Sequence, residues 1–482
     1  MRERHFSVDE GSLGRVDRVS IILFTVIALI GCISVFSSSY EATTESFLSF
    51  SHNYVKQVVW LGISMIVGFI VLLIDTNFIY KYSYPLYIAG VILLMLTLLF
   101  GREVNGAKAW FEFGFFRVQP VEVVKITTSL ALARVLSDNN FSITSLSGLS
   151  TIGTVLAIPL LIIVLQNDTG SGIVFGSLLF VLYREGLSKW LTIPPIIIAT
   201  IFALSLIVTP VILLLAIMIA TMVIDASMSN EYHIHISAFA AMIIVAIVLS
   251  LGSYLIIGSG LTAYHSLVIV CCIVAFAALI HSLIHSLRQR IAIIGISLIT
   301  IALIPLSNYI FEDILRPHQQ NRIMSFLGIV NDPLGSDYNV NQAKIAIGSG
   351  GVWGKGFLEG TQIRYGFVPE RHTDFIFCSV GEEWGFVGSL ILLACFGALI
   401  LRLMHIGEMQ NNIYSRVYCY CVASILLFHL FVNVGMTIGL FPVMGIPLPM
   451  VSYGGSSLLA FTVMIFIAIR MSANIQRKNN RH

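Results

Sequence analysis

The sequence predicts an all-α polytopic integral membrane protein. Hydrophobic residues make up 57% of its 482 residues and charged residues only 11%, and the mean hydropathy is +0.91. Apolar runs of about 17–25 residues recur along the chain, and this is the length that a helix needs to cross the hydrocarbon core of a bilayer. A membrane β-barrel would instead show alternating segments of about ten residues.

Fourteen apolar runs have the length and composition of membrane spans. The first is expected to be an uncleaved anchor, because so many later spans follow it. The stretch 191–226 is divided at Thr209-Pro210, because a single helix of that length would be about 54 Å long and proline breaks the helical hydrogen-bond ladder. The expected spans lie near residues 20–38, 55–75, 80–100, 121–137, 150–166, 171–186, 191–208, 210–226, 236–257, 263–285, 291–309, 382–402, 416–440 and 453–472.

The distribution of Lys and Arg predicts that both termini face the cytoplasm. With that orientation sixteen basic residues fall in the inner segments, whereas the short outer loops carry only Lys56, Arg102, Lys108 and Arg117. This bias agrees with the positive-inside rule. The net charge of +2 therefore reflects topology and gives no indication of nucleic-acid binding. The seven cysteines show neither zinc-site spacing nor a disulfide framework.

Two outer segments are too long or too apolar to be simple connections. Residues 101–120 are expected to be re-entrant or interfacial, and residues 310–381 form a loop of about 70 residues. Loops of this length in compact proteins usually carry function. Within the loop, the glycine-rich stretch 347–356 fails the spacing of a phosphate-binding loop and predicts a flexible loop with close backbone approach. We therefore expect the substrate to be handled at the outer leaflet.

Residues 369–377, PERHTDFIF, gather ionisable side chains against an apolar run. These side chains are Glu370, Arg371, His372 and Asp374. Asp374 directly precedes an aromatic segment that could partly desolvate its carboxylate, raise its pKa and suit it to act as a general base. Interfacial charges paired with one another would produce the same pattern, and spacing alone does not decide between the two.

Ionisable residues at membrane depth form a second candidate site. Glu122 and Lys125 are three residues apart at the outer end of one expected span, so they share a helix face. Asp168 lies at the outer end of the next span. Such residues are costly within a membrane and suggest function. A Lys125–Asp168 pair would neutralise both charges, either as a purely structural tie between two helices or as part of a cavity wall.

Several long motifs resemble those of the SEDS family, the shape, elongation, division and sporulation proteins. The resemblance covers nearly all of the chain outside about 187–308. The segments that carry it are NGAKAWF (105–111), QPVEVVK (119–125), QNDTGSG (166–172), 332–362, PERHTDFIF (369–377), GEEWGFVG (381–388) and 433–457. The residues that depart from the family pattern are Ala109, Val121, Asn167 and Ala343, and none of these is an aspartate.

The resemblance implies a SEDS-type helical bundle of about 14 transmembrane helices, with a ten-helix family core, about four extra helices and one large extracytoplasmic loop. Four extra spans preserve the parity that keeps this loop outside. Residues 1–186 would hold six core helices, 187–309 one further core helix together with the extra spans, 310–381 the catalytic loop, and 382–482 the last three core helices with a basic cytoplasmic tail.

For function, the resemblance implies a peptidoglycan glycosyltransferase of the bacterial cell membrane that polymerises lipid II, and the motifs are most similar to the RodA (elongation) branch. The implied partners are a class B penicillin-binding protein, which is a transpeptidase, elongation-complex proteins and membrane lipid. The alternatives are a lipid II flippase and a non-catalytic scaffold for a cell-wall transpeptidase.

Residue roles carry over by position. Asp374 matches the essential loop aspartate, and Arg322 matches the arginine that opens the long loop. Glu122, Lys125 and Asp168 match the ionisable residues of the family's cavity. Lys108, Glu370, Arg371 and His372 are added as candidate substrate-binding residues. A divalent cation, Mg²⁺ or Mn²⁺, would assist the leaving group, with Asp374 as a candidate ligand, and no organic cofactor is implied.

Overall fold

The chain divides into two compact units in a computed structural model: residues 1–188 together with 321–482, and residues 189–320. Each unit is described by itself. The described residues are 16–40, 50, 52–104, 106–113, 116–139, 141–229, 243–248, 263–284, 288–327, 329 and 336–473.

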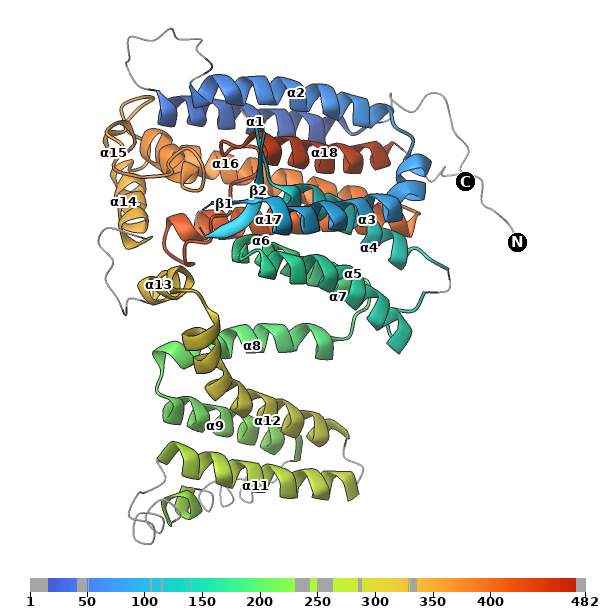
Figure 1. Ribbon diagram of the computed structural model, residues 1–482, viewed down its shortest axis with the longest axis vertical. Coiled ribbons are helices and arrows are strands. Elements are labelled where there is room, and N and C mark those ends of the chain that lie inside the picture. The colour runs from blue at the N-terminus through green and yellow to red at the C-terminus, as the bar shows by residue number, and fades with distance from the viewer. Residues whose placement is uncertain are drawn as a thin grey trace, which may run out of the picture. The chain divides into compact units, whose positions relative to one another are not determined.

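The first unit is a helical bundle (Figure 1). Its helices are α1 (Arg18–Ser39), α2 (Asn53–Leu73), α3 (Thr76–Phe100), α4 (Pro120–Leu136), α5 (Leu146–Leu165), α6 (Thr169–Gly176), α7 (Leu178–Arg184), the part of α13 (Pro317–Phe326) from Asn321 onward, α14 (Ser336–Ser349), α15 (Thr361–Arg364), α16 (Ile376–Glu408), α17 (Ile413–Thr437) and α18 (Gly455–Ser472). Across the described residues of both units, eight helices are long and apolar enough to cross a membrane. The prediction of a multi-pass helical membrane protein is therefore confirmed.

Helices α4, α17 and α18 form the centre of this bundle. About two-thirds or more of the most apolar part of α17 and α18 is buried within the protein, whereas α1, α2, α3 and α5 bury less than half of theirs. Nearly every residue of α4 is buried as well. A helix that meets protein on all sides can carry polar groups that a lipid-facing helix cannot. The candidate residues of α4 lie in this protected centre.

The segment predicted to be re-entrant or interfacial is a small antiparallel sheet, and the all-α prediction is corrected there. Strands β1 (Arg102–Val104), β2 (Ala107–Phe113) and β3 (Phe116–Val118) pair in the order β1-β2-β3. Glu112 of β2 forms ion pairs with Arg102 and Arg117 from its two neighbouring strands.

Helix α16 is kinked at Gly385, whose φ of 65° lies in the left-handed region. At this kink the glycine-rich loop joins the helix through backbone hydrogen bonds from Phe386 N to Gly351 O (2.9 Å) and from Lys355 N to Glu382 O (3.0 Å). A Cβ at Gly385 would lie 2.3 Å from Gly354 N. The prediction of close backbone approach is therefore confirmed, and glycine is required because only it permits this conformation and spacing.

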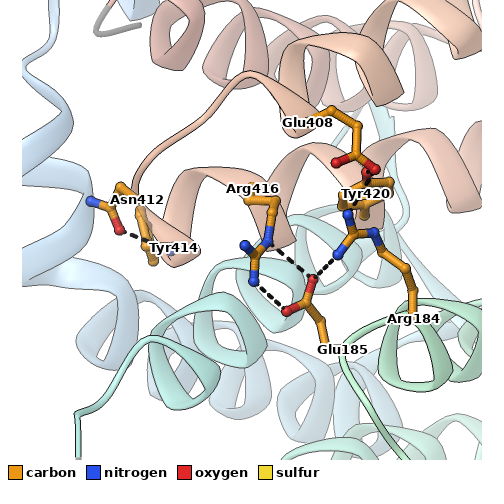
Figure 2. A network of polar contacts seen from close by, with 7 residues as sticks. All are labelled: Arg184, Glu185, Glu408, Asn412, Tyr414, Arg416 and Tyr420. Carbon is orange, nitrogen blue, oxygen red and sulfur yellow. Dashed lines mark hydrogen bonds and ion pairs between the residues drawn. The ribbon is translucent and has the colours of Figure 1, made fainter. Parts of the chain in front are cut away.

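One end of the bundle carries a polar network that connects α7, α16 and α17 (Figure 2). The carboxylate of Glu185 accepts from Arg184 (3.0 Å) and Arg416 (2.7 Å). Arg184 also pairs with Glu408 at 2.7 Å, and Tyr420 donates to the same carboxylate. Glu185 is almost buried, with 8% of its side chain exposed, so its pairs are screened less than ordinary surface pairs.

The described residues of the second unit include four long helices with a core of their own. Helices α8 (Lys189–Ile207), α9 (Pro210–Ser229), α11 (Ala263–Ile284) and α12 (Arg288–Tyr309), with the π-helix η2 (Ile310–Ile314) after α12, run alongside one another (Figure 1). The predicted break at Thr209-Pro210 is confirmed, because α9 begins at Pro210. Most of the predicted span 236–257 lies outside the described residues. Within it only residues 243–248 are described, and these are helical.

Candidate functional site

The site is built where the end of the long loop meets the segment between α17 and α18. Three successive carbonyl groups of the loop, those of His372, Thr373 and Asp374, accept hydrogen bonds from that segment and from α17. The donors are Tyr453 N (2.8 Å), Ser452 Oγ (2.7 Å) and Asn433 Nδ2 (2.8 Å), in that order. The two sequence motifs that contain these residues, 369–377 and 433–457, therefore dock directly onto each other.

The carboxyl group of Asp374 is half-buried. Burial raises its pKa to about 6, the negative charge of Glu370 contributes in the same direction, and the positive charge of Arg322 opposes the rise. The backbone of Gly445 lies against the carboxylate, since a Cβ built there would be 3.6 Å from Asp374 Oδ2. A carboxyl with this pKa is mostly ionised at pH 7 and remains basic enough to accept a proton.

The other ionisable residues of 369–377 have separate partners. The Glu370 side chain accepts from Thr373 Oγ1 at 2.7 Å, and the backbone φ of Glu370, +50°, is unusual for a non-glycine residue. Arg371 Nε donates to Ser38 O at 2.8 Å. Burial lowers the pKa of His372, whose ring lies 5.9 Å from that of Tyr453. These contacts fix the shape of the turn that presents Asp374.

A buried cluster connects α4 to α17. Lys125 Nζ is 2.8 Å from Glu122 Oε2 and 3.0 Å from His429 Nε2, and Lys125 and Glu122 are at most 3% exposed. His429 Nδ1 is 3.1 Å from Pro447 O. A carbonyl only accepts, so Nδ1 carries the proton and Nε2 accepts from Lys125. The segment that approaches Asp374 is thus linked through His429 to the ion pair.

The proposed Lys125–Asp168 pair is wrong. Asp168 caps the N-terminus of α6, where it accepts from Ser171 N (3.1 Å) and Ser171 Oγ (2.8 Å), and it also accepts from Gln119 Nε2 at 2.9 Å. Lys125 finds its counter-charge in Glu122, one helical turn away on its own helix. A local pair of this kind needs no second helix to form, so it wins over the longer-range one.

Lys108 lies in β2, and its Nζ donates to Leu99 O at 3.0 Å, near the end of α3. Arg322 lies on α13, close enough to Asp374 for its charge to act on that carboxyl. Of these two basic residues, Arg322 is the one whose charge acts on the Asp374 carboxyl.

Sequence reasoning missed three polar residues that organise the site. His429 and Asn433 are spaced i, i+4 on α17, and uncharged polar residues within an apolar span were the available signal. Glu382, within 381–388, is fully buried. Its carboxylate accepts from Lys355 Nζ (2.7 Å), Gln362 N (3.0 Å) and Ile363 N (3.0 Å), and so holds the loop that precedes 369–377.

A resident metal site does not fit the donors of this centre. Among the described residues, no three His, Cys, Asp or Glu side chains gather as metal ligands. Asp374 and Glu370 offer two carboxylates at most. Mg²⁺ commonly binds one or two carboxylates together with substrate phosphates, so a cation here would have to arrive with a phosphorylated substrate. No step proposed below depends on one.

The fold and the site define a multi-pass membrane protein whose ionisable residues gather where a long loop enters a membrane helix. The chain belongs to the FtsW/RodA/SpoVE family, because the family model described as "Cell cycle protein" matches residues 17–240 and 210–479. It is 32% identical over 461 residues to the peptidoglycan glycosyltransferase RodA of Treponema pallidum, an alignment that covers 95% of this chain and 97% of that protein.

Other relatives and solved structures agree. The peptidoglycan glycosyltransferase MrdB of Escherichia coli K12 is 31% identical over 395 residues, covering 82% of this chain and 78% of MrdB. RodA of Thermus thermophilus shares the fold, with a TM-score of 0.54 at 21% identity over 96% of this chain and 98% of that one. A chain of a peptidoglycan synthase complex gives a TM-score of 0.59 at 21% identity, covering 96% of this chain and 99% of that chain.

Proposed function

We propose that this protein is a peptidoglycan glycosyltransferase that polymerises lipid II into glycan strands, with Asp374 as the general base. The observation that carries the proposal is the half-buried Asp374 carboxyl, whose pKa is raised to about 6 by burial and whose backbone is fixed by hydrogen bonds from a second signature motif. Curated relatives aligned over most of the chain are named peptidoglycan glycosyltransferases, which supports the reaction class.

In the proposed reaction, the hydroxyl oxygen of the acceptor sugar attacks the anomeric carbon of the donor. The bond from that carbon to the pyrophosphate oxygen breaks, and the electron pair leaves with the polyprenyl pyrophosphate. The acceptor proton passes to the Asp374 carboxylate. A single base opposite the leaving group implies inversion at the anomeric carbon, by analogy with inverting glycosidases. General-base catalysis of this kind contributes typically about 10²–10⁴-fold to a rate.

The negative charge that develops on the pyrophosphate leaving group has to be neutralised by nearby cations. Arg322 is best supported, because its charge already acts on Asp374. Arg371 and Lys108 stay candidates, although each donates to a backbone carbonyl, that of Ser38 and that of Leu99. Glu370 and His372 would shape the turn that presents Asp374. If a divalent cation accompanies the pyrophosphate, Asp374 and Glu370 are the carboxylates available to it.

The buried residues fit a supporting role. Glu122 and Lys125 are closed off from solvent by helix packing, and Asp168 is a helix cap. We propose that they maintain the wall behind the substrate, and that the polyprenyl tails lie against lipid-facing grooves between helices.

For topology, we propose fourteen spans with both termini in the cytoplasm and residues 310–381 on the outer face of the bacterial cell membrane. The support is the positive-inside bias.

We place the protein in the elongation branch, as a rod-shape polymerase. Identity is 31–32% to RodA and MrdB but 26% to FtsW of Escherichia coli O6:H1. The proposed partner is a class B penicillin-binding protein, because a fold neighbour was solved in a complex that couples polymerisation and crosslinking. Complementation of elongation-depleted and division-depleted cells would distinguish the branches.

The deciding test is polymerisation in detergent, where no leaflets exist. Purified full-length protein, with and without a class B penicillin-binding protein, is expected to convert lipid II into glycan strands that a muramidase digests. A lipid II flippase or a transpeptidase scaffold would make no polymer under these conditions. If the folded protein made no polymer in both cases, alone and with the class B penicillin-binding protein, the proposal would be contradicted.

The polymerisation rate is expected to fall as the pH drops through about 6. Asp374 must be ionised to accept a proton, and its pKa is raised to about 6 by burial. Below that pH the rate should decrease about tenfold per pH unit. Initial rates from pH 4.5 to 8, with thermal unfolding recorded at each pH as a control for intact fold, measure this. A midpoint near pH 4 would mean that no carboxyl with a raised pKa limits the reaction.

A further inference from the structure

We infer that Asn433 is a positioning residue, which clamps the backbone of Asp374 to the segment between α17 and α18 and so keeps the base in its desolvated place. This inference rests on the proposed role of Asp374. The juxtaposition that carries it is a single buried amide group that donates to two carbonyls from opposite sides of the site, Asp374 O at 2.8 Å and Ile446 O at 2.7 Å.

The amide orientation of Asn433 follows from its partners. Both carbonyls can only accept, so the nitrogen of the amide must face them and the oxygen must point away. Asn433 is fully buried on α17, and Oδ1 has no hydrogen-bond partner among the described residues. An unpaired buried acceptor is unfavourable for stability. A gain in stability therefore does not explain the asparagine at this position. It is better explained by the two segments that its donated hydrogen bonds join, the loop at Asp374 and the segment at Ile446.

These two hydrogen bonds hold the loop and the segment between α17 and α18 in the arrangement that places the Asp374 carboxylate. One joins the loop at Asp374, and the other joins the segment whose Gly445 backbone lies against the Asp374 carboxylate. Without the clamp, the loop and the segment can separate at that point and admit water to the carboxyl. Water lowers a carboxyl pKa that burial has raised. Asn433 thus controls both where the base stands and how basic it is, without contacting the substrate itself.

Two neighbouring contacts extend the clamp. Ser452 Oγ donates to Thr373 O at 2.7 Å, one residue before Asp374. His429, one helical turn before Asn433, donates to Pro447 O at 3.1 Å and leads back to Lys125. Two polar residues on one face of α17 therefore grip the same segment, and a rigid helix, not a loop, sets the position of the base.

The test is Asn433→Ala in the full-length protein, assayed with lipid II and the class B partner over pH 4.5–8. We expect kcat to fall about 10–100-fold, with KM for lipid II changed by less than about twofold. We also expect the acidic midpoint of the rate to move from about 6 toward lower pH, because the carboxyl becomes hydrated. The second variant, Ser452→Ala, should shift the midpoint in the same direction by less.

A matched control is Ser424→Ala, which removes a side-chain hydrogen bond from the same helix to Ser177 O (2.7 Å) but leaves the clamp intact. Its midpoint should stay that of the natural protein. The inference is overturned if folded Asn433→Ala keeps the natural kcat and midpoint while Asp374→Asn is inactive. It is also overturned if Asn433→Ala fails to fold and Ser452→Ala shows no shift. An active Asp374→Asn would refute the proposed base instead.

Discussion

Asp374→Asn is expected to yield a folded membrane protein that makes no measurable glycan polymer. Asparagine has nearly the same shape and keeps the backbone carbonyl that accepts from Asn433, but it cannot take up the acceptor proton. The expected loss is at least about 10²–10⁴-fold, the usual contribution of a general base. The measurement is the initial rate of polymerisation of lipid II by purified protein with its partner.

Thermal unfolding provides the control for this substitution. The folded state raises the pKa of Asp374 from the ordinary 3.8 to about 6, so the ionised carboxyl favours the unfolded chain at neutral pH. The stability that the protonated group provides is complete below about pH 4 and is lost as the pH rises through about 6. Asparagine never ionises, so Asp374→Asn should melt at the same temperature as the natural protein or higher. Long glycan strands from this variant would show that another group is the base.

Lys125→Met is expected to destabilise the protein by about 3–5 kcal/mol, the range for breaking a buried ion pair by removing one partner. Glu122 would remain as a carboxylate that is only 3% exposed and has lost its counter-charge. The double variant Glu122→Gln, Lys125→Met should recover most of the loss, because no uncompensated charge is left in the centre of the bundle. Both effects are measured as changes in the melting temperature in detergent, with the loss of the monodisperse peak as the signal for unfolding.

The exposed ion pair between Arg117 and Glu112 is the matched comparison. Their side chains are 65% and 20% exposed, and surface pairs contribute roughly 0–1 kcal/mol. Arg117→Met should therefore lower the melting temperature only slightly. Equal effects of Lys125→Met and Arg117→Met, or a double variant no more stable than Lys125→Met, would mean that the buried pair does not stabilise the α4–α17 contact.

Hydropathy made the helical membrane fold predictable, because span length and apolar composition are properties of each segment alone. The division at Pro210 and the close approach of the glycine-rich loop were predictable for the same reason. The sheet at 102–118 was not predictable, because strands of three to seven residues carry too little periodicity to identify.

The part of the site in which ionisable residues are adjacent in the sequence was predictable. The part that forms when the fold brings distant residues together was not. Asp374 is conspicuous among its ionisable neighbours. The partner of Lys125 was wrongly assigned to another helix, because spacing cannot show which of two carboxylates the folded chain brings closer. His429 and Asn433 were missed because an uncharged polar residue in an apolar span reveals its importance only through partners 18 and 59 residues away in the sequence.

The burial of α4 has a consequence for the biogenesis of the protein. Helix α4 has 17 residues, includes Glu122 and Lys125, and would meet the translocon as a poor membrane segment, since charged residues make the insertion of a helix less favourable. Its buried neighbours α17 and α18 begin at Ile413 and Gly455, so they are synthesised last. It follows that α4 reaches its final environment only when the C-terminal helices arrive, and that a chain truncated before Ile413 would leave it without the surroundings it needs.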